Sequence, residues 1–234
     1  ERGRILSDNA LIYTYIGKFE KSLKFFNKAL ESTAKLKYRR GESYNRNYFG
    51  ELLMHLGRYE DALQSFQIGL KHADEINATR PKVLLLSNIG RMYSYFKKEK
   101  AEFYLLKGYS LAKKMNTPRE TQLTALNLGR YYLFNREYSK ARKILKKAIK
   151  LNNPQTNSLV KLYYGIANLI EDPSNSKIEE LEFLLKNYSE LSEVSKNKPY
   201  LPIMNFFSFH IADLISACYQ SDKVKIEKII KMFQ

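Results

Sequence analysis

The sequence predicts an all-α solenoid, and two patterns support this prediction. Apolar residues fall at helical spacing along nearly the whole chain, as in Leu63, Phe66 and Leu70, and no stretch alternates apolar and polar residues as a strand would. A second pattern recurs about every forty residues. It consists of a small residue, a large apolar residue four positions later, and another small residue seven positions after the first. Repeats of this length indicate helical units that bury their apolar faces by stacking on one another.

The recurring pattern fills four units between residues 1 and 151. In chain order, its small, large and small positions are Ser22, Phe26 and Ala29, then Ala62, Phe66 and Gly69, then Ala101, Leu105 and Gly108, and then Ala141, Leu145 and Ala148. A further small residue precedes each set, at Ala10, Gly50, Gly90 and Gly129. Each unit is therefore expected to contain two helices. The predicted pairs are 4–16 with 19–36, 41–56 with 59–76, 80–95 with 98–115, and 118–134 with 138–151.

Glycine and proline residues mark the expected boundaries of these helices. Gly17 and Gly57 lie in the tight turns inside the first two units, where a left-handed backbone suits glycine best. Pro81, Pro118 and Pro154 each follow a short polar stretch. Proline is favoured in the first turn of a helix because the N–H that it lacks would be unpaired there, so each proline is expected to begin a helix.

The repeat fades after residue 151, although Gly165 resembles the first-helix glycine of a fifth, degenerate unit. Weaker helices are predicted near 155–170, 176–193, 199–219 and 222–233. Terminal units of a solenoid are atypical because one face meets water. We therefore expect four well-defined repeats in residues 1–151, and degenerate repeats with capping helices of the same solenoid in residues 152–234. The apolar pair Phe206 and Phe207 suits a homodimer contact through the C-terminal helices as well as a cap.

The charge of the chain is strongly positive and uneven. There are 40 Lys and Arg residues against 24 Asp and Glu residues, which gives a formal net charge of +16. Residues 1–150 hold 31 of the basic residues and 14 of the acidic ones, so the whole of the excess lies in the four repeats. Such a field attracts an acidic peptide, nucleic acid or an anionic membrane surface without distinguishing among them.

Cysteine content and the chain ends bear on the compartment. Cys218 is the only cysteine, so an intramolecular disulfide is excluded and a reducing, cytoplasmic location fits best. No signal peptide is evident, and the absence of an initiator methionine suggests a fragment or a processed chain of a larger regulator. The apolar run from Tyr200 to Tyr219 is interrupted by proline, asparagine, histidine and aspartate, so no membrane span is expected.

With these residues in place, the chain resembles the tetratricopeptide-repeat (TPR) family, well over residues 5–151 and weakly beyond. In that family each unit is an antiparallel helix pair with small residues at the helix crossing, as at Gly50, Ala62 and Gly69, and an aromatic residue precedes the second helix, as at Tyr59. The resemblance implies a right-handed superhelical solenoid of antiparallel helix pairs, with about twelve helices.

Two features depart from the usual pattern of the family. Arg46 and Ala125 occupy the place of the large residue near the start of the first helix in the second and fourth units. The period is near forty residues, rather than about 34. Longer repeats of this kind resemble those of Rap-type regulators, kinesin light chains and the sensor region of the maltose-regulon activator. These relatives bind peptides, partner proteins or small effectors, so the resemblance implies recognition without naming the ligand.

The first helices of the family line a concave groove, and two of them share a string here. Asn88-Ile-Gly-Arg91-Met-Tyr93 in the third unit matches Asn127-Leu-Gly-Arg130-Tyr-Tyr132 in the fourth, and Asn and Arg three apart lie on one helix face. An amide pairs with an extended peptide backbone, and an arginine fork binds a carboxylate or phosphate. The alternative is that the asparagines tie helices together and the arginines form solvated ion pairs. The predicted groove comprises Asn47, Tyr48, Glu51, Ser87, Asn88, Arg91, Tyr95, Asn127, Arg130 and Phe134.

Catalysis finds little support in the sequence. His55, His72 and His210 are far apart, no set of histidine, cysteine and carboxylate residues has the spacing of metal ligands, and no glycine-rich phosphate loop follows a strand. We therefore expect no enzyme activity, no metal and no cofactor.

Three functional hypotheses follow. The first is a non-enzymatic scaffold whose basic concave groove binds a protein or peptide, with an acidic or extended segment favoured. The second is an effector-sensing regulatory domain of a larger transcriptional or signalling protein. The third is nucleic-acid binding through the four basic repeats, which predicts an affinity that falls steeply with salt. No aromatic-basic recognition module in the sequence supports the third.

Overall fold

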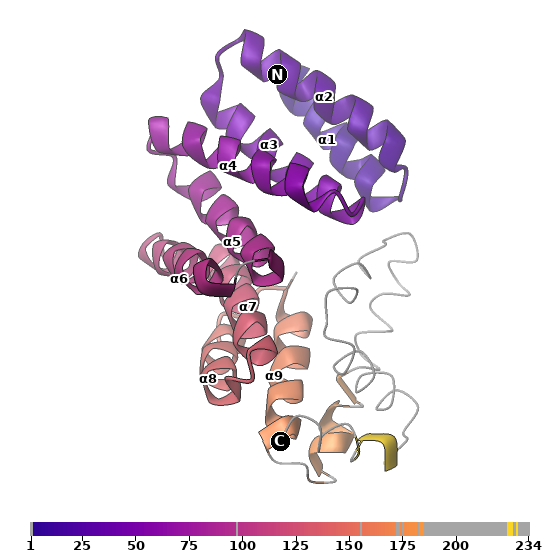
Figure 1. The fold of residues 1–234 in the computed structure, drawn as a ribbon, viewed down its shortest axis with the longest axis vertical. Coiled ribbons are helices and arrows are strands. Elements are labelled where there is room, and N and C mark those ends of the chain that lie inside the picture. The colour runs from indigo at the N-terminus through magenta and orange to yellow at the C-terminus, as the bar shows by residue number, and fades with distance from the viewer. Residues whose placement is uncertain are drawn as a thin grey trace. The chain divides into compact units, whose positions relative to one another are not determined.

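The chain folds into consecutive α-helices (Figure 1). The computed structural model describes residues 2–96, 98–154, 156–171, 174, 176–181, 183–184, 224–226 and 228. The helices assigned in this part of the chain are α1 (Arg2–Tyr15), α2 (Phe19–Lys35), α3 (Arg39–His55), α4 (Tyr59–Glu75), α5 (Thr79–Phe96), α6 (Lys98–Lys114), α7 (Pro118–Phe134), α8 (Tyr138–Ile149) and α9 (Asn157–Glu171). The first eight helices correspond to the four predicted pairs, with boundaries that differ by two residues at most.

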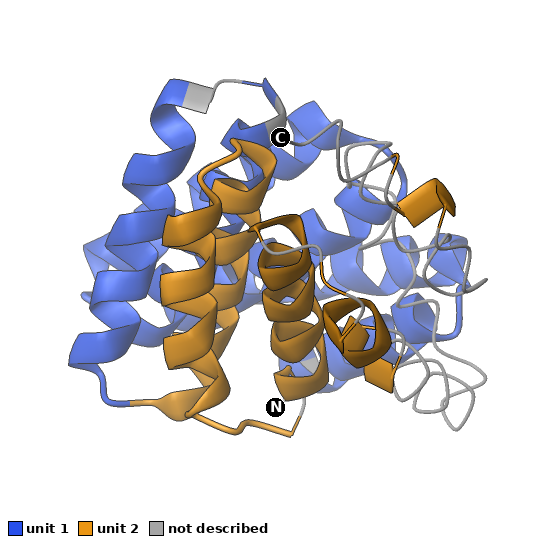
Figure 2. Ribbon diagram, turned by 90° about the horizontal axis from the view of Figure 1, so that it is seen from below, with its two compact units in different colours: residues 1–116, 197–199 blue, residues 117–196, 200–234 orange. Residues whose placement is uncertain are grey.

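Two compact units divide the chain, with the boundary between Asn116 and Thr117 (Figure 2). The first unit contains α1 to α6, in which α1 packs on α2, α3 on α4 and α5 on α6 as antiparallel pairs. Each pair also packs on the next through α2 with α3 and α4 with α5, while the first helices α1, α3 and α5 contact one another in series. The second unit contains α7, α8 and α9, each of which contacts the other two.

The recurring small and large residues meet at the crossing of each helix pair. A Cβ atom added to Gly50 of α3 would lie 2.4 Å from the ring of Phe66 in α4, too close for any side chain. The same clash, at 2.6 Å, would arise between Gly90 and Leu105 and between Gly129 and Leu145. The large residue of the second helix therefore occupies the space that the glycine of the first helix leaves open. This contact explains why the two patterns recur together in the sequence.

The turns between helices that the structure describes each contain a residue in the left-handed conformation. Gly17 and Gly57 have φ angles of +74° and +72°, as the sequence predicted. In turns without a glycine, a different residue has the positive φ angle: Lys37, Asn77, Asn116, Arg136 or Asn152. Such a residue reverses the chain direction and lets backbone N–H groups close the preceding helix, as when Lys18 N donates to Tyr13 O over 2.9 Å.

The predicted roles of the prolines hold for two of the three. Pro118 is the first residue of α7, and Pro81 lies in the first turn of α5. Pro154 is different, because it lies in the turn before α9, which begins three residues later at Asn157. That turn is held instead by side chains: Gln122 Nε2 donates to Asn157 Oδ1 over 3.1 Å, and Asn157 Nδ2 donates to Asn152 Oδ1 over 2.7 Å.

Gly165, which the sequence places in a fifth, degenerate unit, lies against the helical segment that follows it. Gly165 in α9 faces Leu181 and Leu184, whose Cδ1 atoms lie 3.3 and 3.1 Å from the position a Cβ would take. Residues 176–181, 183 and 184 are helical, so the glycine again meets a large residue of the following helical segment. Most of the helices predicted near 176–193 and 222–233, the whole of the one near 199–219, and the pair Phe206 and Phe207 lie outside the described residues.

The described residues confirm the predicted fold class, an all-α repeat of antiparallel helix pairs. Among them, no helix has both the length and the apolar composition needed to cross a bilayer. The predicted division at residue 151 stays a prediction. The two compact units separate at a different point, after the third helix pair.

Candidate functional site

A hydrogen-bonded network joins the first helices of the second and third repeats. Asn88 of α5 uses its Nδ2 to donate to Asn47 Oδ1 over 3.0 Å and to Glu51 Oε1 over 2.9 Å, both in α3. Asn47 Nδ2 also donates to Glu51 Oε1 over 3.3 Å, and Arg91 Nη1 donates to Asn88 Oδ1 over 3.0 Å. We call these four residues the α3–α5 network. The expected common face of Asn88 and Arg91 is therefore present.

The electrostatics of the network centre on Glu51. Burial raises the pKa of this carboxyl above its usual value, while the hydrogen bond from Asn88, the positive charge of Arg91 and the hydrogen bond from Asn47 act in the opposite direction. The pKa of the nearby His55 is lowered, first by burial and then by the charge of Arg91. A half-buried carboxylate and a half-buried guanidinium group thus influence one another within a framework of amides.

Exposure separates the network into two kinds of residue. Asn47 is 1% exposed and Asn88 is 4% exposed, so their amides serve the contact between α3 and α5. Glu51 and Arg91 are only half-buried, as is Tyr48, whose ring lies 6.4 Å from that of Tyr44. The asparagines act as the inter-helix ties that the sequence left as the alternative interpretation. The side chains available to a ligand in this network are those of Glu51 and Arg91.

Two more of the predicted groove residues lie on α5. Ser87 is 1% exposed, and its backbone nitrogen lies 3.3 Å from the position that a Cβ of Gly108 would take, which places it against α6. Tyr95 is in the last turn of the helix, and its side chain is outside the described part of the structure.

The other predicted groove residues belong to the second compact unit. Asn127 and Arg130 of α7 are each 5% exposed, and Phe134 is half-buried. The Arg130 guanidinium lies 5.3 Å from the ring centroid of Tyr163 in α9, a cation–π contact. Arg130 therefore packs against the next first helix of its own unit, whereas Arg91 sits in a polar network.

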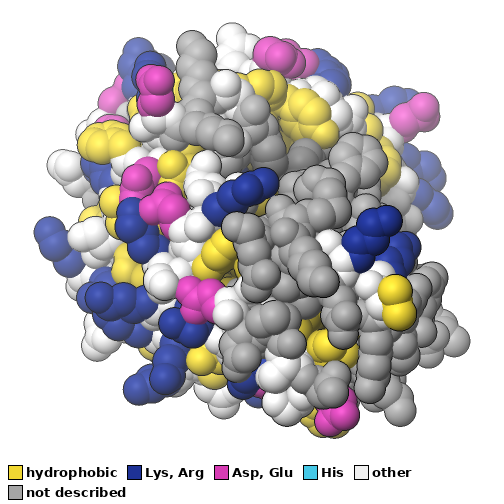
Figure 3. Space-filling model, turned by 60° about the horizontal axis from the view of Figure 1, so that its bottom comes forward, with side chains coloured by type: hydrophobic (Ala, Val, Ile, Leu, Met, Phe, Trp, Pro, Cys, Tyr) yellow, Lys and Arg dark blue, Asp and Glu magenta, His cyan; other side chains and the backbone are white. Residues whose placement is uncertain are grey.

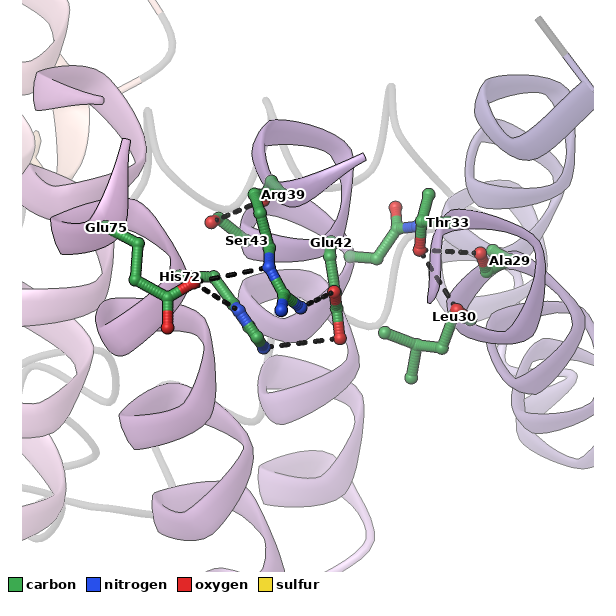
Figure 4. Close-up of polar contacts among 9 residues, drawn as sticks. Ala29, Leu30, Thr33, Arg39, Glu42, Ser43, His72 and Glu75 are labelled. Carbon is green, nitrogen blue, oxygen red and sulfur yellow. Dashed lines mark hydrogen bonds and ion pairs between the residues drawn. The ribbon is translucent and has the colours of Figure 1, made fainter. Parts of the chain in front are cut away.

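A second polar cluster, which the sequence analysis did not anticipate, fastens α3 to α4 (Figure 4). Glu42 is 5% exposed and lies 3.1 Å from Arg39 Nη1 and 3.3 Å from His72 Nε2. Glu75 Oε2 lies 3.2 Å from Arg39 Nε and 3.5 Å from His72 Nδ1. The spacing of three residues between Arg39 and Glu42, and again between His72 and Glu75, was visible in the sequence, but their meeting across two helices was not.

The chemistry of this cluster favours a structural role. The nearby Ser43 hydroxyl donates to the carbonyl of Arg39 over 2.8 Å, so it is not aligned with His72 as a nucleophile would be. Within the described residues, no group of three or more histidine, cysteine or acidic side chains is arranged to hold a metal ion. Two carboxylates, a guanidinium and an imidazole instead lie within ion-pair distance of one another at the helix contact.

The basic side chains of the described residues are dispersed on one face of the molecule (Figure 3). On the face shown in Figure 3, Lys and Arg side chains stand at several separate places, with acidic and apolar side chains between some of them. Some of this charge is paired locally, as in Lys82 with Asp74 at 2.6 Å and Arg58 with Asp61 at 2.7 Å. Net charge alone therefore does not identify a binding surface.

Comparison with known proteins identifies the class of repeat. The tetratricopeptide-repeat family model matches residues 10–36 and 124–155, in the first and fourth predicted units. Both segments contain the small and large positions singled out above. The chain thus resembles the tetratricopeptide-repeat family in sequence over these two segments, and in fold.

Solved structures with the same fold support this assignment. RapI in its apo form aligns with 100% of this chain and 82% of its own, with a TM-score of 0.76 and 16% identity. The Rap conjugation gene regulator of plasmid pLS20, solved with the Phr* peptide, aligns over 99% of this chain and 61% of its own, with a TM-score of 0.69 and 20% identity. TPR-like repeats of a Podosopora anserina protein described as a kinesin light chain align over 82% and 99%, with a TM-score of 0.63 and 13% identity.

These likenesses extend to the fold and no further, because all three identities are low. No curated protein matches the sequence. The expected resemblance to Rap-type regulators and kinesin light chains is confirmed at the level of the repeat architecture.

Proposed function

We propose that this chain is a peptide- or protein-binding repeat domain whose ligand, an extended acidic segment, is held at the α3–α5 network. The observation that carries the proposal is the network itself, in which Glu51 and Arg91 are half-buried and are held in place by two buried asparagines. Preorganised polar groups on rigid helices lose little freedom when a ligand arrives. The proposal requires no catalytic group.

Each half-buried side chain has a role in this proposal. The Arg91 guanidinium binds a carboxylate of the ligand, since a planar fork matches a carboxylate in two hydrogen bonds. Glu51 accepts a backbone N–H of the extended segment, while its hydrogen bonds from Asn88 and Asn47 hold it in place. The Tyr44 and Tyr48 rings, on the same helix as Glu51, supply apolar contact area.

The test is a selection of random peptides displayed on phage against the whole chain, followed by fluorescence anisotropy with the enriched sequences. Enrichment of aspartate and glutamate is expected. Arg91→Ala should weaken binding of the enriched peptides about tenfold, the usual effect of losing a charge-assisted contact. The matched control is Arg40→Ala, which removes the same charge from an exposed position at the start of α3.

Two results would refute the proposal. Equal affinity of the enriched peptides for the wild type and Arg91→Ala would exclude this network as the site. Steeply salt-dependent binding of single-stranded DNA, with no peptide enrichment, would favour the nucleic-acid hypothesis instead.

A second candidate function is effector sensing by a regulatory domain of a larger protein. It is favoured by the fold similarity to Rap regulators, one of them solved with a peptide. Because Asn88 and Asn47 tie α3 to α5, a ligand that competes for Glu51 would alter the contact between these helices. Hydrogen exchange of α3 and α5 that changes on peptide binding would support sensing, and unchanged exchange would favour a passive scaffold.

A further inference from the structure

An exposed apolar pair lies on the outer face of α6. Phe103 is 61% exposed and Leu106 is 42% exposed, three residues apart on one side of the helix. The Phe103 ring meets the Tyr104 ring edge-on at 5.3 Å, and Tyr104 lies 5.3 Å from Tyr93 of α5. Phe103 is thus the outer end of a series of aromatic contacts that reaches the buried Tyr93.

Lysines surround this pair. Lys107 Nζ lies 5.7 Å from the centroid of the Phe103 ring, and Lys100 Nζ lies 5.9 Å from that of Tyr93. The residues exposed on α6 are Glu99, Lys100, Phe103, Leu106, Lys107, Ser110, Lys113 and Lys114, so four lysines stand against one glutamate. At helical spacing, all of them fall on one face. We call this face the α6 patch.

The repeat itself provides the comparison that makes the apolar pair informative. When the helix pairs are aligned on the buried small and large residues, Phe103 corresponds to Lys24 in α2, Gln64 in α4 and Lys143 in α8. At the same alignment Leu106 corresponds to Asn27, Gln67 and Lys146, all of which are exposed. These two positions are exposed in all four second helices, and only α6 among the four places apolar side chains there.

We propose that the α6 patch is a docking site for an acidic amphipathic helix of a partner protein, separate from the α3–α5 network. Phe103 and Leu106, three residues apart on a helix, form a ridge that packs into the groove of a second helix. The flanking lysines pair with carboxylates on either side of that helix, as charges flank the apolar seam of a coiled coil. Charge complementarity selects the acidic partner, and the exposed ring supplies a hydrophobic anchor.

The probe is a fluorescein-labelled synthetic helix with leucines along one face and glutamates on both sides of it. A scrambled peptide of the same composition has the same charge but no apolar face. The wild-type chain is expected to bind the amphipathic helix about tenfold more tightly than the scrambled peptide, because only the former buries Phe103 and Leu106. Fluorescence anisotropy measures both affinities.

The chain offers matched variants for this test. Phe103→Gln with Leu106→Gln copies the exposed residues of α4, so folding is preserved, and about tenfold weaker binding of the amphipathic helix is expected. Gln64→Phe with Gln67→Leu transfers the apolar pair to α4, where the exposed charges are mainly acidic, at Glu60, Asp61, Asp74 and Glu75. In a chain that also carries the two glutamine substitutions on α6, the transferred pair is expected to restore no binding.

Several outcomes would overturn the proposal. They are equal affinity for the amphipathic and scrambled peptides, unchanged binding by the double glutamine variant, and restored binding by the transferred pair on α4. Binding to vesicles of phosphatidylcholine and phosphatidylglycerol that depends on Phe103, without binding of the helix, would assign the patch to membranes. Because Arg91→Ala leaves the α6 patch intact, failure here is distinguishable from failure of the peptide site at the α3–α5 network.

Discussion

The α3–α5 and α7–α9 junctions bring the same repeat positions together but fill them with different chemistry. Each first helix contains one glycine of the repeat. In both junctions, the residue directly after this glycine in one first helix contacts a residue of the next first helix, two positions before the glycine there. At the first junction these residues are Glu51 and Asn88, joined by a hydrogen bond of 2.9 Å. At the second they are Arg130 and Tyr163, where the guanidinium lies 5.3 Å from the ring centroid.

The difference shows what decides the role of a repeated motif. Asn88 and Asn127 are both buried, and the tyrosines that end the two strings each have a lysine over the ring, Lys100 at 5.9 Å from Tyr93 and Lys140 at 5.2 Å from Tyr132. The environment of the arginine differs, because Arg91 donates to the Asn88 amide whereas Arg130 lies beside the Tyr163 ring. Two similar strings therefore give a half-buried arginine in α5 and a buried arginine beside an aromatic ring in α7.

The largest expected effect comes from removing the ring at the second junction. Tyr163 is fully buried, and Tyr163→Ala should lower the free energy of unfolding by about 3–5 kcal/mol, since it leaves a cavity and removes the aromatic partner of Arg130. Denaturant titration followed by circular dichroism measures the change. Tyr164→Ala, at the half-buried neighbouring position, is the control and should cost much less. Equal losses for the two variants would contradict the assigned packing.

The two arginines should differ in their contribution to stability. Arg130→Ala is expected to cost about 2 kcal/mol, because a buried guanidinium contributes both packing and a desolvated cation–π contact. Arg91→Ala is expected to cost about 1 kcal/mol, the usual value for a hydrogen bond such as the one to Asn88. Thermal and denaturant unfolding of the two variants side by side would test the order. A larger loss of stability for Arg91→Ala than for Arg130→Ala would contradict this difference between the two junctions.

Much of the fold could be predicted from the sequence, because the repeated glycines and large residues are local signs of a helix crossing. The meeting of Gly50 with Phe66 recurs at Gly90 with Leu105, and one contact type repeated along the chain is visible without coordinates. The site was less predictable. Asn88 and Arg91 could be placed on one face of a helix, but their burial depends on neighbouring helices that the local pattern does not describe.

The ion-pair cluster and the α6 patch illustrate the same limit. His72 seemed isolated in the sequence, because its partner Glu42 is thirty residues away on another helix. The sequence also does not distinguish Phe103, which is exposed, from the buried apolar residues of the same helix. Long-range pairing and exposure are properties of the packed repeat, whereas spacing within one helix is a property of the sequence.

The pH dependence of stability should distinguish the polar junction from the aromatic one. The pKa of Glu51 is raised in the folded chain, chiefly by burial. Its contribution to stability is therefore fully present below the ordinary carboxyl value and is lost as the pH rises through the raised folded value. Glu51→Gln keeps an acceptor for Asn88 and Asn47 but removes this titration.

The measurement is the free energy of unfolding of wild type and Glu51→Gln across the acidic to neutral range. As the pH increases, the free energy of unfolding of the variant should rise relative to that of the wild type. This rise should be smaller than the loss of stability expected for Arg130→Ala. Glu31→Gln serves as a control of opposite sign, because the hydrogen bond and charge of Lys35 lower the pKa of this exposed carboxyl. A constant difference between Glu51→Gln and wild type at all pH values would contradict the burial of Glu51.

The smallest expected effect is that of Arg91→Lys, which separates charge from geometry at the polar junction. A lysine retains the positive charge near Glu51 but lacks the planar fork that binds a carboxylate through two hydrogen bonds. Stability should therefore change by less than about 0.5 kcal/mol, and the pH dependence attributed to Glu51 should remain. Binding of an acidic peptide should nevertheless fall, and anisotropy titration at constant salt would detect this. If Arg91→Lys binds the peptide as well as the wild type does, the junction contributes only positive charge, and the guanidinium geometry that distinguishes Arg91 from the exposed lysines has no role in recognition.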